Sequence, residues 1–128
     1  MNIFAIEGKG NNIDWVKSAQ SLDNYRVVKM ILESCQMLCT AINHQHGAKV
    51  TPYKNAHLNH PSTKWVRESF PSSNTTPLPL CMPEEYKSNN TVESYRRFYT
   101  DKPRMRYPTS KIPKWFVEYR TTEFQQIG

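Results

Sequence analysis

The spacing of apolar side chains predicts one long helix in the first half of the chain. From about Asp23 to about Asn43 they recur at steps of three and four residues, which places them on one stripe of a helix. The stripe consists of Val28, Ile31, Cys35, Leu38 and Ile42. Other apolar side chains flank it, so the helix is apolar around more than half of its circumference, and we expect it to be central. Gly47 is a suitable stop signal.

A polar stripe follows the same helix with the same kind of spacing. Its members are Lys29, Glu33, Gln36, Thr40 and Asn43. Two interpretations are open: the stripe is the solvated face of an amphipathic helix, or it lines a cleft because the helix is central. Glu33 is the best candidate for a catalytic acid or base, with Lys29 or His60 as its partner, because apolar surroundings would raise the pKa of its carboxyl group. A structural salt bridge between Glu33 and Lys29 is the alternative.

Shorter elements follow from the rest of the pattern. Residues 1–7 are a short apolar segment that suits a buried strand or an extended arm. A second helix should begin near Pro61, and a third should run from the N-cap residue Asn90 to about Thr100. Residues 112–119 form an aromatic segment whose structure the pattern leaves undecided.

The fold class follows from these elements and from the size of the chain. Residues 71–81 are rich in proline and hydroxyl side chains, as loops and flexible linkers are. A chain of 128 residues and 15.0 kDa suits one domain. We therefore predict a mainly α-helical fold, a single compact helical domain over residues 1–128 with a short N-terminal strand or arm and a Pro-rich loop at residues 71–81.

Composition excludes several classes of protein. Only 38% of the residues are hydrophobic, and no apolar run approaches the roughly 18 to 20 residues that cross a bilayer. The first ten residues lack the order of a secretion signal, and Cys35 and Cys39 lie four apart in the predicted helix, where a disulfide is disfavoured. We expect a cytoplasmic protein without a membrane partner. The four histidines form two close pairs without a matching pair of cysteines, so we expect no metal site and no cofactor.

Positive charge is concentrated in one segment. The net charge is +6, and residues 96–114 contain seven basic side chains against the single acid Asp101. The candidate phosphate-binding residues are Arg97, Arg104, Arg106, Lys111 and Lys114. Aromatic side chains interleave with them and could stack on bases, but the helical spacing of Tyr95, Phe98 and Tyr99 suggests that these three belong largely to the core. The segment thus predicts attraction to phosphate, with nucleic acid or a nucleotide as partner.

Catalytic motifs are scarce in this chain. The glycines near the N-terminus match neither common phosphate-binding loop. No Gly-x-Ser-x-Gly elbow occurs, and Cys81 has no histidine at an informative spacing. The sequence leaves open whether the chain is an enzyme.

Six blocks of sequence stand in a fixed order over most of the chain. They are LDNYRVVKMILESCQML at 22–38, HLNHP at 57–61, WVRES at 65–69, MPEEYK at 82–87, VESYR at 92–96 and PKWF at 113–116. As a set they resemble a family of small proteins encoded by T4-like and other tailed bacteriophages. The resemblance implies an association with DNA-metabolism genes and, more remotely, a likeness to the compact helical pyrimidine-dimer DNA glycosylases.

The family's polar pattern overlaps the polar stripe of the long helix. Transferred to this chain, it falls on Asp23, Arg26, Lys29, Glu33, Gln36, Asn59, His60, Trp65, Arg67, Tyr86, Tyr95, Arg96 and Trp115. The resemblance implies that ligand is bound by Arg26, Lys29, Gln36, Asn59, His60, Trp65, Arg67, Tyr95 and Arg96.

This chain departs from the resemblance at two places. Family members continue after Ser69 with a helical stretch rich in Tyr and Trp, whereas this chain passes from Phe70 directly to Pro71. Residues 71–81 are therefore either a Pro-rich loop or the site of a missing helical segment. The dimer glycosylases use an amine exposed by removal of the initiator Met. Here Asn2 follows Met1, and Met is normally retained before a side chain of that size.

Three functions fit these observations. The leading expectation is a phage accessory protein in the host cytoplasm that binds nucleic acid or a phosphorylated nucleotide. One alternative is a glycosylase-like enzyme that acts on a nucleobase or nucleotide, with Glu33 and Lys29 as its catalytic residues. The other alternative is a protein that binds a host factor.

Overall fold

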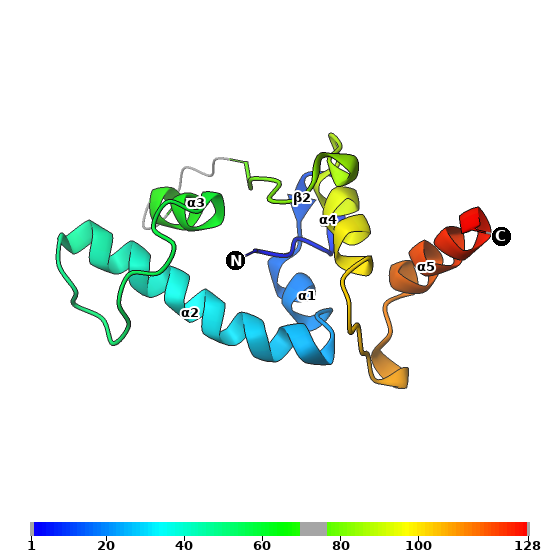
Figure 1. Ribbon diagram of the computed structural model, residues 1–128, viewed down its shortest axis with the longest axis horizontal. Coiled ribbons are helices and arrows are strands. Elements are labelled where there is room, and N and C mark those ends of the chain that lie inside the picture. The colour runs from blue at the N-terminus through cyan, green and yellow to red at the C-terminus, as the bar shows by residue number, and fades with distance from the viewer. Residues whose placement is uncertain (1, 70–76, 128) are drawn as a thin grey trace. The chain divides into compact units, whose positions relative to one another are not determined.

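The computed structural model describes residues 2–69 and 77–127 (Figure 1). Its α-helices are α1 (Trp15–Gln20), α2 (Asn24–His46), α3 (Pro61–Ser69), α4 (Thr91–Thr100) and α5 (Lys114–Ile127). Two-residue strands, β1 (Gly8–Lys9) and β2 (Asn12–Ile13), form one antiparallel pair, and short 3-10 turns lie at Glu84–Tyr86 and Thr109–Lys111. The prediction of a mainly α-helical fold is confirmed. None of the helices in the described part of the chain is long and apolar enough to cross a membrane.

Contacts divide the chain into two compact units, which we describe separately. Unit 1 consists of residues 1–3 and 28–81, and unit 2 consists of residues 4–27 and 82–128. The larger part of unit 1, residues 28–81, is therefore inserted in the sequence between the two parts of unit 2, and the helix α2 begins in unit 2 and continues in unit 1. The prediction of one domain over residues 1–128 stays a prediction.

The core of unit 2 is built from the N-terminal arm and from α4. Ala5 and Ile6 of the arm are fully buried, and so are Tyr95 and Tyr99 of α4. Trp115, at the start of α5, is 7% exposed and lies with its ring centroid 6.4 Å from that of Tyr99. The arm has no strand before Gly8, so the alternative of an extended arm holds for residues 2–6. The expected core position of Tyr95 and Tyr99 is confirmed.

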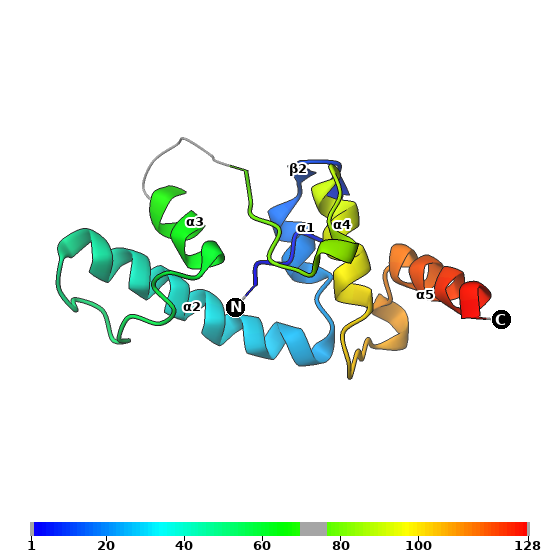
Figure 2. The same cartoon turned by 45° about the horizontal axis from the view of Figure 1, so that its top comes forward.

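A tight hairpin leads from this arm into α1. Gly8 has φ +126°, and a Cβ atom there would lie 2.2 Å from the carbonyl oxygen of Asn12, so only glycine fits. The carbonyl of Gly10 in the turn accepts a hydrogen bond from the amide of Val92 (3.0 Å). Figure 1 and Figure 2 both show β2 beside the first turn of α4, in agreement with this bond. The hairpin thus closes over the N-terminus of α4.

Helix ends follow the sequence signals where a cap residue is present. The Asn90 side chain accepts from the amide of Glu93 (2.9 Å), which confirms the predicted cap of α4. The Asp14 side chain accepts from the amide of Lys17 (2.9 Å) in the same way and begins α1, a six-residue helix that the pattern did not predict. Of the undecided segment at residues 112–119, residues 114–119 form the start of α5.

Unit 1 contains the rest of α2, a loop, and α3. The helix α2 ends at His46, before Gly47 with φ +69°, and α3 begins at Pro61, so both predicted helices are confirmed. Residues 71–76 of the predicted Pro-rich loop lie outside the described residues. Residues 77–81 form neither helix nor strand, and Leu78 among them is 8% exposed.

The face that α2 buries differs from the expectation of a central helix with an internal apolar stripe. Val28 and Ile31 are each 70% exposed, and Leu38 is 47% exposed, whereas Met30 and Met37 are buried. The polar residues Thr40 and Asn43 are buried as well. Their side chains bind the loop that follows α2, so this part of the polar stripe faces the protein and the apolar stripe faces solvent. The interpretation of the polar stripe as a solvated face is therefore wrong for Thr40 and Asn43.

Candidate functional site

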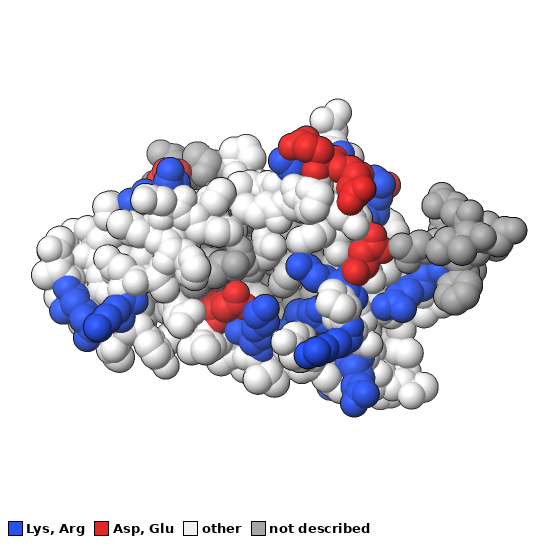
Figure 3. All heavy atoms as spheres, viewed as in Figure 1, with Lys and Arg blue, Asp and Glu red and all other residues white. Residues whose placement is uncertain are grey.

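The basic segment of unit 2 presents its cations to solvent. All five predicted phosphate-binding side chains are exposed: Arg97, Arg104, Arg106, Lys111 and Lys114. Figure 3 shows Lys and Arg side chains gathered on one face of unit 2, over the chain between α4 and α5. Arg120, on the second turn of α5, is also exposed, and its guanidinium lies 5.0 Å from the ring centroid of Phe116. Arg120 was not predicted from the sequence, because it lies six residues beyond the end of the basic segment at Lys114.

The loop that carries Arg104 is held on both sides. Arg26 Nη2 donates to the carbonyl oxygen of Pro103 at 2.6 Å. Three positions later, the Arg106 amide donates to Asp23 Oδ2 at 3.1 Å, and the Arg106 carbonyl accepts from the amide of Asn24 at 2.8 Å. Between these anchors Arg104 has φ +60°, a left-handed conformation that costs a non-glycine residue energy. The anchors fix the backbone at Arg104, and its side chain is exposed.

A buried carboxylate, that of Asp23, holds the backbone of this loop. Asp23 is fully buried, and its Oδ1 accepts from the Tyr99 hydroxyl at 2.7 Å. Arg26, which is 6% exposed, places Nη1 3.6 Å from Asp23 Oδ2. Burial raises the pKa of the Tyr99 hydroxyl, so this group stays neutral and acts as a donor. Arg26, predicted as a ligand-binding residue, is thus used to hold the basic loop.

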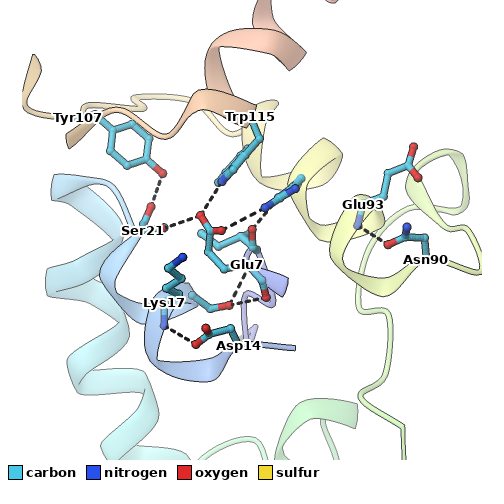
Figure 4. Close-up of polar contacts among 11 residues, drawn as sticks. Glu7, Asp14, Lys17, Ser21, Asn90, Glu93, Tyr107 and Trp115 are labelled. Carbon is cyan, nitrogen blue, oxygen red and sulfur yellow. Dashed lines mark hydrogen bonds and ion pairs between the residues drawn. The ribbon is translucent and has the colours of Figure 1, made fainter. Parts of the chain in front are cut away.

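A second polar cluster fixes the two ends of the basic segment (Figure 4). The Glu7 carboxylate accepts from the Ser21 hydroxyl and from Trp115 Nε1, each at 2.8 Å. Arg96 Nη2 donates to the other Glu7 oxygen at 3.2 Å, and Arg96 Nε donates to the Ile6 carbonyl at 2.7 Å. The Arg96 guanidinium also lies 5.1 Å from the Trp115 ring centroid. Arg96 and Trp115 therefore tie the start and the end of the segment to the N-terminal arm.

The middle of the segment has its own anchor. The Tyr107 hydroxyl donates to the Ser21 carbonyl oxygen, as Figure 4 shows. The Tyr107 and Phe116 ring centroids lie 5.0 Å apart, edge to face. Burial raises the pKa of the Tyr107 hydroxyl as well. The aromatic side chains of the segment are thus used in packing, and the cations remain on the surface.

The polar stripe of α2 is divided between solvent and the following loop. Lys29 is exposed, and Glu33 and Gln36 are half-buried. Asn43 Oδ1 accepts from the amides of Val50 and Thr51, and its Nδ2 donates to the Tyr53 carbonyl. The Thr40 hydroxyl accepts from the amide of Ala56 at 2.9 Å. The C-terminal half of the stripe is therefore structural.

The predicted ligand-binding residues after α2 are spread over unit 1. Asn59 is exposed, and Trp65 is half-buried. His60 Nδ1 accepts from the Ser62 amide at the start of α3 (3.1 Å), and burial lowers the pKa of its ring. Arg67 Nη1 donates to His44 Nε2 at 3.0 Å, a pairing that the spacing of the sequence did not indicate. The structure thus brings Arg67 to the end of α2.

A shallow hollow lies beside this end of α2. Its volume is about 520 Å³, and its lining includes Asn43, His44, Lys49 and Lys54. Asn43 is the only member of the polar stripe in its lining, so this hollow differs from the predicted cleft at Lys29, Glu33 and Gln36.

Neither a metal-ligand cluster among the described residues nor a similar protein indicates the function. Among the described residues, no group of three or more His, Cys, Asp or Glu side chains is arranged to hold a metal ion. The three cysteines are free thiols. Comparison of the chain with protein-family models, with curated proteins and with solved structures found no match.

Proposed function

We propose that this chain binds nucleic acid through the exposed cations of its basic segment, as an accessory protein of a bacteriophage. The observation that carries the proposal is the fixed loop at residues 103–106, in which Arg104 is held in a left-handed conformation with its side chain in solvent. Such a conformation persists only where the surrounding structure enforces it, and it is found preferentially at functional sites. The anchors to Arg26 and Asp23 supply this enforcement.

The burial of the aromatic side chains favours contacts with phosphate over contacts with bases. Tyr95, Tyr99 and Trp115 lie in the core of unit 2 and cannot stack on a base. Guanidinium and ammonium groups attract the phosphate backbone whatever its sequence. We therefore propose binding with little sequence preference.

The spread of the cations favours a polymer over a single nucleotide. The exposed cations extend from Arg97 on α4 to Lys114 on α5, and each can contact a different phosphate of a strand. One nucleotide offers its phosphates at one place and would use only part of this surface. A phosphorylated nucleotide is the ligand that the same cations would hold if the chain does not bind a polymer.

Neutralisation of the loop tests the proposal. The triple variant Arg104→Gln, Arg106→Gln, Lys111→Gln removes three exposed cations and leaves the backbone anchors in place. Binding to a labelled 20-mer, followed by fluorescence anisotropy over a range of NaCl concentrations, should weaken by roughly tenfold or more at low salt. The slope of log K against log salt should become shallower by about 2 to 3, because each lost phosphate contact removes about 0.7 to 0.9.

The matched control removes the same charge elsewhere in unit 2. The variant Lys9→Gln, Lys17→Gln, Lys87→Gln replaces three exposed lysines and should keep the salt slope of the unmodified protein. Equal losses in the two variants would mean that only net charge matters. Absence of binding to single- and double-stranded DNA and RNA at low salt would rule the proposal out.

A further inference from the structure

One face of α2 is apolar and exposed over four turns. We call it the apolar stripe of α2. It consists of the five residues of the predicted stripe, Val28, Ile31, Cys35, Leu38 and Ile42, together with Leu32, and all of them except the half-buried Ile42 are exposed. Val28 and Ile31 are each 70% exposed, and Leu32 and Leu38 are 49% and 47% exposed. Single exposed apolar side chains are ordinary, but a continuous row of them marks an interaction surface. All six residues belong to unit 1, so this face is described within one unit.

The apolar stripe carries no charge. Between Val28 and Asn43 the only ionisable acid and base are Glu33 and Lys29. Both lie on the other side of the helix, in the row that continues to the buried Thr40. A phosphate polymer has nothing to bind on this face, so the stripe is separate from the proposed nucleic-acid surface.

We propose that a second copy of this chain covers the apolar stripe, by antiparallel packing of two α2 helices around a twofold axis. The spacing is that of a two-helix seam, because residues 28, 31, 35, 38 and 42 follow steps of three, four, three and four. The row is also nearly symmetric about Cys35, with Val28 and Ile42 each seven residues away. A twofold axis near Cys35 therefore brings each half of the stripe against the other half of its partner, as a self-complementary interface requires.

The uncharged stripe allows this occupant despite the positive charge of the chain. The chain has a net charge of +6, so two copies repel each other over most of their surfaces. The apolar stripe is free of charge, and its contact forces no pair of like charges together. Antiparallel helices also oppose their dipoles, which is the favourable arrangement.

The length of the stripe sets the strength of the dimer. Fifteen residues of helix extend over about 21 Å. A standard interface buries about 800 Å² on each partner, and a single helix face of this length provides less. The dimer should therefore be in exchange with the monomer, with a dissociation constant on the order of micromolar.

Sedimentation velocity of the full chain over a range of concentrations tests the dimer. The unmodified protein should shift from monomer to dimer between roughly 1 and 100 µM. Ile31→Glu places a charge on the stripe, where it stays solvated in the monomer but would be buried in the dimer, so dimerisation should weaken by at least about tenfold. Circular dichroism should show the same helix content in both proteins.

Val16→Glu is the matched control. Val16 lies on α1 in unit 2 and is 68% exposed, so this change adds the same charge at the same exposure away from α2. It should leave the dimer unchanged. High salt should also leave the dimer intact while it weakens nucleic-acid binding, which separates this inference from the proposed function.

Cys35 provides a direct probe of the proposed twofold axis of the dimer. Cys35 is exposed and Cys39 is buried, so a short bismaleimide should link two Cys35 thiols across the dimer by adding each thiol to one maleimide double bond. The covalent dimer should appear in Cys81→Ser, which removes the half-buried third thiol, and be absent when Cys35→Ser is added to that variant. A chain that stays monomeric at roughly 100 µM, or a dimer that Ile31→Glu does not weaken, would overturn the proposal. Capture of a different protein by a monomeric chain would also overturn it.

Discussion

Asp23 positions a cationic surface loop from inside the protein. Its carboxylate receives the Tyr99 hydroxyl from α4 at 2.7 Å and the Arg106 amide from the basic loop at 3.1 Å. It also accepts from the amide of Arg26, at the start of α2. One buried group thus joins the start of α2 to α4 and to the basic loop, whose contacting residues lie 76 and 83 positions away in the sequence. The position of the exposed cations depends on it even though it touches no solvent.

The neighbour of Asp23, Tyr99, gives a prediction about high pH. Burial raises the pKa of Tyr99 and of Tyr107 above the ordinary value of about 10. Above pH ~10 the unfolded chain loses these protons, while the native state keeps them. The free energy of unfolding therefore has its full value below that pH and falls as the pH rises further. Tyr99→Phe removes one such group. Its free energy of unfolding should fall less steeply between pH ~9.5 and ~11 than that of the unmodified protein.

Urea unfolding followed by tryptophan fluorescence measures this difference. At neutral pH, Tyr99→Phe should be less stable by about 1 to 2 kcal/mol, because Asp23 loses a donor. Tyr53→Phe is the control, since Tyr53 is 42% exposed and the change removes no buried hydroxyl group. Equal pH slopes for Tyr99→Phe and the unmodified protein would contradict the prediction.

The sequence identified the cations, but it did not show which of them are exposed and which make structural contacts. Exposure of Arg97, Arg104 and Lys114 follows from a basic run that no core can bury. The structural use of Arg26 and Arg96 could not be predicted, because their acceptors Pro103 and Ile6 lie 77 and 90 positions away. A basic residue is structural or functional according to such distant partners.

At the scale of elements, α2 shows which features of a helix the spacing of apolar residues predicts and which it does not. The spacing predicted the helix and its end at Gly47, since both depend on local sequence. It did not predict the buried face. Thr40 and Asn43 are buried because they satisfy backbone groups of the loop after α2, and that loop lacks regular secondary structure to satisfy them itself.

Asn43 should be the most sensitive polar residue of this helix. It accepts from the Val50 and Thr51 amides at 2.9 and 3.1 Å and donates to the Tyr53 carbonyl at 3.0 Å. Asn43→Ala leaves these loop groups without partners and should lower the free energy of unfolding by about 2 to 3 kcal/mol. Hydrogen exchange should show lost protection at Val50 and Thr51.

The control for this change lies on the same helix. Gln45 is exposed, and Gln45→Ala should alter stability by less than about 0.5 kcal/mol. If Asn43→Ala unfolds at the same urea concentration as Gln45→Ala, the side chain of Asn43 does not hold the loop.

At the scale of the whole molecule, the histidines and the basic segment lie in different units. All four histidines, at positions 44, 46, 57 and 60, belong to unit 1, whereas the basic segment belongs to unit 2. Histidine is the side chain that ordinarily gains charge between pH 8 and pH 6. Nucleic-acid affinity at constant salt should therefore change by less than about twofold over this range, if the basic segment makes the contacts.

Anisotropy titrations at pH 6, 7 and 8 check this prediction. A marked strengthening toward pH 6 that His44→Gln abolishes would place the contact in unit 1, near Arg67, and would contradict the assignment to the basic segment. The triple variant of the basic segment should show the same flat pH profile at its lower affinity.

The insertion of unit 1 within the sequence of unit 2 fixes an order of folding. Unit 2 is closed by bonds between distant residues, such as Glu7 with Trp115, 108 positions apart, and Asp23 with Tyr99, 76 positions apart. Contacts of this kind form slowly because a long loop must close first, whereas the bonds of Asn43 to Val50 and Thr51 are local. During synthesis the N-terminal arm therefore emerges with its partners still missing, and it must stay unaggregated until residue 115 has left the ribosome. We therefore expect the environment of the Trp115 side chain to become native only when unit 2 closes.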